Sequence, residues 1–156
     1  GLYTEAGIIV KQMREKGITV PFVGADALDS SGLVDIAGEA VINTYYTSVA
    51  GEVSSTEAGK EFVKTYEEKY TGKKAEAFSV YGYDTMGVIL SAIEKTIEAN
   101  GGEKPSREQI AEAIRATQDF QGALASVSLD EKGDNSKAQI YLFKFEEASY
   151  PGTLQK

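Results

Sequence analysis

Helical and strand patterns alternate along the first part of this chain, and that order limits the folds available to it. Apolar residues recur at intervals of three and four between Thr4 and Lys16, which predicts a helix with Thr4 as a candidate N-cap and Gly17 after its end. The β-branched and aromatic runs Ile18 to Gly24 and Ala40 to Ser48 predict strands, with a short helix between them. Because parallel neighbours need a crossover helix, this order predicts an α/β fold with mainly parallel strands.

The later part of the chain is richer in helices than in strands. Apolar residues spaced four apart from Ala58 to Tyr70 predict one helix, and Ser106 begins a capping-box sequence that opens another. The most apolar helix is predicted over Tyr83 to Ala99 and is expected to pack against a sheet. Its apolar stripe consists of Met86, Ile89, Leu90, Ile93 and Ile97. Leu124 to Leu129 and Ala138 to Phe145 are predicted strands joined by a loop. An average sheet has about five strands or more, so some strands are expected to belong to a part of the protein outside this chain.

Composition removes most of the common catalytic chemistries. The 156 residues include no cysteine and no histidine, which excludes disulfides, thiolate nucleophiles and the commonest general base. The formal net charge of −8 is opposite to the basic surface that binds phosphates, so nucleic acid is not an expected partner. No apolar stretch approaches the roughly 20 residues that span a bilayer. No cofactor is expected, because motifs for phosphate cradling and serine acylation are also missing.

Asp26 stands directly after the first predicted strand, at the edge where open α/β sheets bind ligands. A carboxylate there can accept charge-assisted hydrogen bonds from an ammonium group, each contributing about 1.5–3 kcal/mol. Alternatively, Asp26 or Asp29 forms a local turn or caps the helix near Ser31. The two acids could also be a catalytic pair of the kind used in glycoside hydrolysis, but nothing else in the sequence supports that interpretation.

Three aromatic residues, Phe78, Tyr81 and Tyr83, gather just before the long apolar helix. A cluster at the start of a helix most often packs in a core. It can also form a pocket wall that covers an apolar side chain while a hydroxyl group binds a polar partner.

The acidic run from Asp130 to Asn135 is superficially like a calcium loop. That loop needs an oxygen ligand at its third position and glycine at its sixth, where this chain has Lys132 and Asn135. We therefore predict no metal site here, but a loop between strands in which Gly133 takes a positive φ.

A succession of short motifs points to one family. In order they are Gly1 to Gly7, Val20 to Asp26, Ile36 to Ala40, Tyr83-Asp84 and Leu129 to Asp134. Each motif is loose alone, but their order and spacing resemble the carboxy-terminal half of the periplasmic branched-chain amino-acid-binding proteins, the solute-binding components of ABC importers. The resemblance runs from Gly1 to about Phe145.

The resemblance implies a two-lobed type I fold with three-layer, doubly wound sheets, which binds an amino acid in the cleft between its lobes. Residues 1–49 would be the end of the second lobe, residues 50–137 the returning part of the first, and residues 138–156 the final strand and tail that cross back to the second. The early half of each lobe would lie outside this carboxy-terminal fragment, which accounts for the missing strands.

Carried over residue by residue, Asp26 falls where the family has an acidic residue, often glutamate, that pairs with the α-ammonium group of the ligand. Leu2 falls where some members have a tyrosine lining the cleft, with Tyr3 beside it. Phe78 falls near an aromatic residue that covers the ligand side chain. We expect these residues, together with Tyr81, to bind the ligand, while the resemblance implies that the neighbouring Tyr83 packs inside.

The implied function is capture of a branched-chain or related amino acid by lobe closure, with a membrane ABC permease as partner. The protein is expected outside the cytoplasm, periplasmic or lipid-anchored at the outer face of the membrane, with any leader before Gly1 already removed. The half chain is expected to bind its missing amino-terminal half or a second copy of itself. Two alternatives are an α/β enzyme, or its regulatory subunit, that uses only carboxylates, and a ligand-sensing domain of a regulator or receptor on the same fold.

Overall fold

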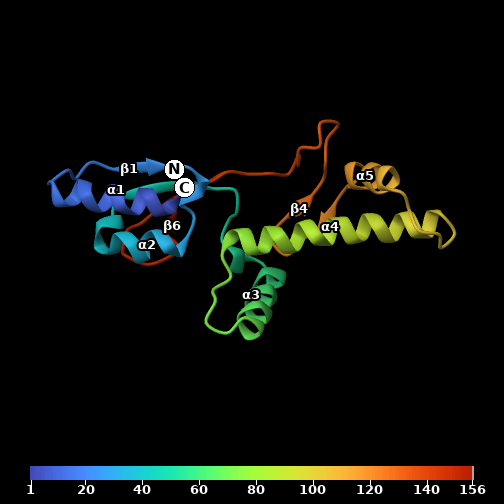
Figure 1. The fold of residues 1–156 in the computed structure, drawn as a ribbon, viewed down its shortest axis with the longest axis horizontal. Coiled ribbons are helices and arrows are strands. Elements are labelled where there is room, and N and C mark those ends of the chain that lie inside the picture. The colour runs from blue at the N-terminus through green and yellow to red at the C-terminus, as the bar shows by residue number, and fades with distance from the viewer. Residues whose placement is uncertain (156) are drawn as a thin grey trace. The chain divides into compact units, whose positions relative to one another are not determined.

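The computed structural model describes residues 1–155, which divide into two compact units. Unit 1 consists of Gly1–Glu52 together with the chain from Gln139 onward, and unit 2 consists of Val53–Ala138. Figure 1 shows helices α1 and α2 side by side with strands in unit 1, and the helices α3, α4 and α5 in unit 2. None of the helices among the described residues has the length and apolar character needed to cross a bilayer.

The helical elements of unit 1 follow the sequence pattern closely. They are α1 (Tyr3–Glu15), the 3₁₀ turn η1 (Asp26–Leu28), α2 (Ser31–Ala37) and the 3₁₀ turn η2 (Gly38–Val41). Helix α1 ends as predicted, with Gly17 at a φ of 74° directly after the cap residue. Its N-cap is Leu2 rather than Thr4, so the helix begins two residues earlier than a cap at Thr4 predicts. Ser30 caps α2, because its hydroxyl accepts a hydrogen bond of 3.2 Å from the Gly32 N–H.

The sheet of unit 1 has the strand order β1-β2-β5-β6. Its strands are β1 (Phe22–Gly24), β2 (Thr44–Ser48), β5 (Tyr141–Lys144) and β6 (Thr153–Leu154). The expectation of mainly parallel strands holds for β1 and β2, whereas β2–β5 and β5–β6 are antiparallel. The difference arises because a helical crossover joins β1 to β2, while β5 enters after unit 2 and β6 follows β5 through a short loop. Both predicted strands are longer than β1 and β2, and β1 begins only after Pro21, which has no N–H to donate.

The core of unit 1 lies between one face of this sheet and the helices. Tyr46 stacks on Phe143 at a centroid distance of 5.4 Å and contacts Phe145 at 5.1 Å, and Leu33 of α2 packs in the same cluster. On the opposite face Val23 and Leu142 are 67% and 40% exposed. Within the described residues, helices therefore cover one face of the sheet, so this chain alone forms two of the three layers that the resemblance implies.

Unit 2 consists mainly of helices. Its elements are η3 (Val53–Ser55), α3 (Glu57–Lys69), α4 (Ala77–Ala99), α5 (Arg107–Arg115), β3 (Phe120–Gln121) and β4 (Ser126–Val127). The capping box that opens α5 is confirmed, because Ser106 and Gln109 exchange side chain to backbone hydrogen bonds of 3.2 and 2.8 Å. The two predicted late strands do not pair with each other, since β4 pairs with β3 and β5 belongs to unit 1. Gly133 has the predicted positive φ, at 89°.

Helix α4 begins at Ala77 rather than at Tyr83 and packs through a different face from the one predicted. The buried residues of this helix include Val80, Val88 and Ala92, whose spacings are multiples of four residues, so they lie on one face. Of the predicted apolar stripe, Met86 and Leu90 are instead 53% and 57% exposed, and its three isoleucines are half-buried. Helix α4 therefore uses small residues for contacts inside unit 2, while the face expected to meet a sheet remains open.

Candidate functional site

Asp26 lies where the backbone turns sharply after β1. It is the first residue of η1, its side chain is half-buried, and its carbonyl oxygen accepts a 2.9 Å hydrogen bond from the Asp29 N–H. The turn is tight because Leu28 folds back over the strand, and a Cβ added at Gly24 would lie 2.3 Å from Leu28 Cδ2. Since β1 and β2 are parallel, Asp26 stands at the carboxyl end of a parallel pair, the position that the sequence predicted.

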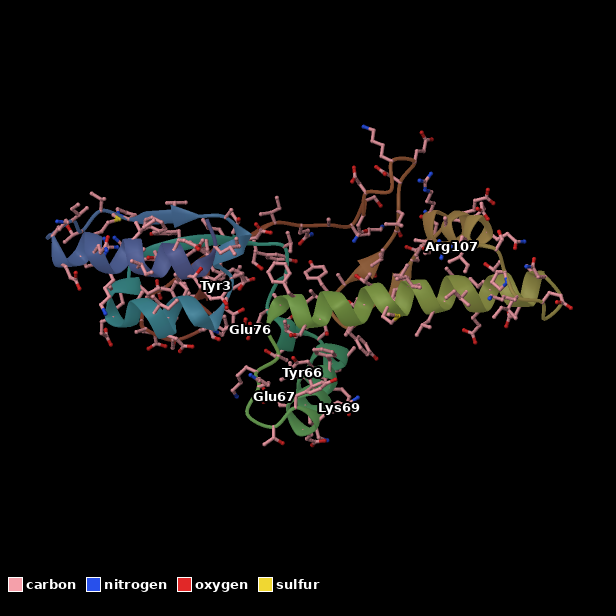
Figure 2. All side chains as sticks on the ribbon, in the orientation of Figure 1. Tyr3, Tyr66, Glu67, Lys69, Glu76 and Arg107 are labelled. Carbon is pink, nitrogen blue, oxygen red and sulfur yellow. The ribbon has the colours of Figure 1, made fainter. Side chains whose placement is uncertain are left out.

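Leu2 and Tyr3 lie at the start of α1, a helix that contacts η1. The half-buried ring of Tyr3 faces the start of α2, where a Cβ added at Gly32 would lie 2.5 Å from Tyr3 Cε2 (Figure 2). Leu2 is 58% exposed. The structure therefore places these two predicted residues on an element that touches the turn carrying Asp26.

The carboxylate of Glu5 orders this end of α1. It accepts a 2.9 Å hydrogen bond from the Leu2 N–H. Hydrogen bonds from its own backbone N–H, from the Thr4 side chain and from the Leu2 N–H lower the pKa of Glu5, so the carboxylate remains ionised. A negative charge in the first turn also suits the helix dipole. Glu5 thus keeps Leu2 and Tyr3 at a defined helix start.

Asp29 has a different environment from Asp26. It is only 6% exposed, and its two carboxylate oxygens accept hydrogen bonds from the Ser48 hydroxyl at 2.5 Å and the Tyr150 hydroxyl at 2.8 Å. The alternative in which Asp29 caps α2 is wrong, because Ser30 does so. The interpretation of the two acids as a catalytic pair also loses its basis, since the carboxylate of Asp29 is buried and engaged by hydroxyl groups inside the unit.

Sequence reasoning missed this role of Asp29. One of its partners, Tyr150, lies 121 residues further along the chain, and no local pattern signals such a contact.

Phe78 and Tyr81 stand in the first turns of α4, so they belong to unit 2, whereas Asp26, Leu2 and Tyr3 belong to unit 1. The predicted site is thus divided between the two units. Phe78 is 52% exposed, and Tyr81 is half-buried.

Tyr83 does not pack inside unit 2 as the resemblance implied. It is 60% exposed, and its ring lies 5.1 Å from that of Phe62 on α3.

An aromatic groove that the sequence did not predict lies between α3 and α4, with a volume of about 580 Å³. The rings along α3 follow one another at centroid distances of 5.6 and 4.9 Å, because the residues that carry them are four apart. Figure 2 shows two of the lining residues, Tyr66 and Lys69, on α3. Its lining residues include Phe62, Tyr66, Lys69, Tyr70, Tyr83 and Gln121. The spacing from Ala58 to Tyr70 therefore predicted the helix correctly but not that its aromatic stripe would be open.

Solved structures with the same fold show the class of protein to which this chain is similar. A leucine-binding protein, LivK, from Thermotoga maritima matches the whole chain with a TM-score of 0.83 and 34% sequence identity, and the match covers 42% of that chain. LivJ, the branched-chain amino-acid transporter substrate-binding protein of Streptococcus pneumoniae, solved in complex with isoleucine, matches with a TM-score of 0.81 and 25% identity over 100% of this chain and 43% of its own. The chain thus has part of the fold of a type I periplasmic binding protein, and the predicted α/β class is confirmed.

The sequence comparisons agree with this class. The model of a family described as periplasmic binding protein matches residues 4–149, so the chain belongs to the periplasmic binding protein family. A Leu/Ile/Val-binding protein homolog from Brucella abortus is 28% identical over 149 residues, covering 96% of this chain and 38% of the relative. A leucine-, isoleucine-, valine-, threonine- and alanine-binding protein from Pseudomonas aeruginosa is 27% identical over 134 residues, covering 86% of this chain and 34% of the relative. The chain thus spans well under half the length of the relatives it matches.

Proposed function

We propose that this chain forms part of the solute-binding component of an ABC importer that captures a branched-chain or related amino acid. The relatives support the ligand class, since those compared above are named for binding leucine, isoleucine or valine. In this proposal unit 1 is the end of the second lobe with its final strand, unit 2 is the returning part of the first lobe, and the ligand is held between the lobes. The observation that carries the proposal is the half-buried Asp26 at the carboxyl end of the β1–β2 pair.

Each predicted residue has a role suited to its chemistry. The carboxylate of Asp26 accepts hydrogen bonds from the ligand α-ammonium group, an interaction strengthened by partial removal from water. Leu2 and Tyr3 form an apolar wall beside it, while Phe78 and Tyr81 on the other unit cover the ligand side chain. Such a division suits a protein that closes around its ligand by a hinge motion.

The proposed partner is a membrane permease, and the proposed location is outside the cytoplasm, either periplasmic or lipid-anchored. No step of this function requires bond making or breaking, so we propose no catalytic role for Asp26. The net charge of −8 is compatible with a ligand that presents a cationic group.

The experiment is calorimetric titration of the complete protein with L-leucine. Asp26→Ala is expected to weaken binding by about 2 kcal/mol or more, because it removes one partner of a desolvated charge pair. This corresponds to a loss of roughly 30-fold in affinity. Asp35→Ala is the matched control, since Asp35 is an exposed acid on α2 of the same unit and its loss should leave affinity unchanged.

A second ligand tests the chemistry of the contact directly. 4-Methylpentanoate has the leucine side chain and carboxylate but no ammonium group, so Asp26→Ala should not weaken its binding. If Asp26→Ala bound L-leucine as tightly as the unchanged protein, Asp26 would not be the ammonium partner.

A further inference from the structure

Three segments that are distant in the sequence meet at the carboxylate of Asp29. One oxygen accepts from the hydroxyl of Ser48, the last residue of β2, and the other accepts from the hydroxyl of Tyr150 in the tail. Asp29 is 6% exposed and Ser48 is 1% exposed, so these hydrogen bonds are shielded from water. Because a buried carboxylate is costly without partners, the two hydroxyl groups and Asp29 depend on one another.

The same network reaches the segments through which the chain leaves and re-enters unit 1. Ser48 Oγ also accepts a 3.0 Å hydrogen bond from the Ala50 N–H, and the chain passes into unit 2 after Glu52. Tyr141, at the start of the returning strand β5, is the register partner of Ser48. The network therefore fixes the ends of both connections.

Asp29 also closes the turn that carries Asp26. Its N–H donates to the Asp26 carbonyl oxygen at 2.9 Å, and Leu28, which lies between the two acids in the sequence, is buried against Gly24. A shift of Asp29 would therefore move the backbone of Asp26. The Asp29 side chain thus links this turn to Ser48 of β2 and to Tyr150 of the tail.

We propose that Asp29 is a positioning residue for ligand binding, which couples the turn carrying Asp26 to the connecting segment at Ser48 and Ala50. The hydroxyl of Tyr150 in the tail holds the Asp29 carboxylate in place. The inference rests on the proposed function of Asp26. Without ligand, the network keeps Asp26 in the position that binds the ammonium group. Because the same network links the turn to the connecting segment, the two move together when the ligand binds. The hydroxyl groups of Ser48 and Tyr150 act through Asp29 and do not touch the ligand.

The test is a double-mutant cycle in the complete protein, with L-leucine as the probe and calorimetry as the measurement. Tyr150→Phe keeps the ring and removes only the hydroxyl donor, and it should weaken L-leucine binding by about fivefold or more. In the Asp26→Ala background the same change should alter affinity by less than about twofold, because the residue being positioned is gone. Ser48→Ala reaches the same carboxylate from β2 and should behave in the same way.

Controls separate positioning from general loss of stability. Tyr45→Phe is the matched control, because Tyr45 lies on the opposite face of β2 from Ser48 in the same unit, so its loss should leave the affinity for L-leucine unchanged. Thermal unfolding without ligand shows whether each variant is folded at the titration temperature, and if Tyr150→Phe is not, Ser48→Ala decides the outcome.

Equal weakening in both backgrounds, or no weakening in either, would show that the network only supports the fold and would overturn the positioning role. If Asp26→Ala alone leaves affinity unchanged, the proposed function of Asp26 fails and the inference fails with it. If Asp26→Ala is weakened while both hydroxyl variants bind normally, only the positioning role is lost.

Discussion

The two units bury very different side chains. Unit 1 encloses large residues such as Tyr46, Phe145 and Leu33, each essentially inaccessible to water. Among the described residues of unit 2 no leucine, isoleucine or aromatic side chain is buried, and the buried apolar side chains there are valines, alanines and Pro105. A domain is normally organised around one core of large apolar side chains. Unit 1 therefore has most of such a core, whereas the described residues of unit 2 do not form one.

The open face of α4 shows what unit 2 lacks. Tyr83, Met86 and Leu90 recur at helical spacing and are each more than half exposed. Burying an apolar side chain of this size contributes about 1.5–3 kcal/mol. Because the chain spans 38% of its Brucella relative, the proposal above places the covering sheet in the remainder of the protein.

The largest expected effect concerns the association of the 156-residue chain. With the α4 face uncovered, we predict that the chain self-associates, exchanges elements with another copy or binds the amino-terminal half when that is supplied, because exposed apolar patches find partners. Alone it should bind L-leucine weakly or not at all. Light scattering coupled to size-exclusion chromatography measures the mass, and calorimetry measures the binding.

One substitution on each unit sharpens this result. Leu90→Lys places a charge on the α4 face and should reduce association, while Val20→Lys changes a residue of unit 1 with nearly the same exposure, 59% against 57%, and should not. A stable, cooperatively folded monomer with micromolar leucine affinity would contradict the view that unit 2 lacks its sheet.

The next effect compares the same substitution in the two units. Leu33→Ala should destabilise unit 1 by about 2–5 kcal/mol, because it empties a fully buried site in the core. Leu90→Ala should change the stability of this chain by only about 0.5 kcal/mol or less, as expected for an exposed position. Hydrogen exchange of amides in β2 and α4 reports the two units separately.

In the complete protein, we expect the effect of Leu90→Ala on stability to be larger than in this chain. There Leu90→Ala should cost about 2 kcal/mol or more if a sheet covers α4, while the effect of Leu33→Ala should be unchanged. Equal, small effects of Leu90→Ala in both proteins would mean that the α4 face is solvent-exposed in the intact molecule.

A smaller effect is expected at the buried carboxylate of unit 2. Asp84 is 6% exposed and accepts hydrogen bonds from the N–H groups of Ala123 at 2.7 Å and Leu124 at 3.1 Å, which ties the β3–β4 turn to α4. Asp84→Ala leaves both donors without their acceptor and should cost about 1–3 kcal/mol. Faster amide exchange at residues 120–127, with unit 1 unaffected, is the expected result. An unchanged exchange rate there would show that the turn is held by other contacts.

The sequence predicts the helices and their ends better than it predicts which residues pack against them or how the strands pair. The Ser106 N-cap of α5 and the positive φ of Gly17 after α1 depend on a few neighbouring residues, so both predictions are confirmed. The periodicity of α4 predicted a helix but assigned its packing to the wrong face, because spacing alone does not show which partner is present. The antiparallel pairing of β5 was missed for a related reason, since strand direction depends on a connection that runs through unit 2.

The candidate site shows the same limit. Asp26 is predicted because its position after a strand is a local signal, and the family resemblance adds Leu2, Tyr3, Phe78 and Tyr81 to the prediction. The sequence alone is compatible with Asp29 as a turn residue, a helix cap or one of two catalytic acids, but not with its observed role, because its partners Ser48 and Tyr150 are brought to it by tertiary structure. Contacts between distant segments are set by the whole fold, so residues that act through other residues escape local pattern analysis.

The smallest expected effect is a pH dependence confined to unit 1. Burial raises the pKa of the Tyr46 hydroxyl above its usual value, outweighing the opposing effect of a 3.1 Å hydrogen bond from the Gly152 N–H, and the nearby Asp29 carboxylate raises the pKa further. Above about pH 10 the unfolded chain loses this proton while the folded chain keeps it, so the unfolded state binds fewer protons and stability falls as pH rises, by about 1.4 kcal/mol per pH unit. Below pH 10 both states are protonated and Tyr46 contributes no pH dependence.

Tyr46→Phe should remove this alkaline slope at a cost of about 1 kcal/mol at neutral pH, whereas Tyr45→Phe, on the other face of β2, should leave the slope as it is. Urea unfolding between pH 8 and 11, followed by amide exchange in β2, measures the slope. An equal slope in the unchanged chain and in Tyr46→Phe would mean that the hydroxyl ionises in the folded state as readily as in the unfolded one, and that the core of unit 1 is less closed to water than that of an intact lobe.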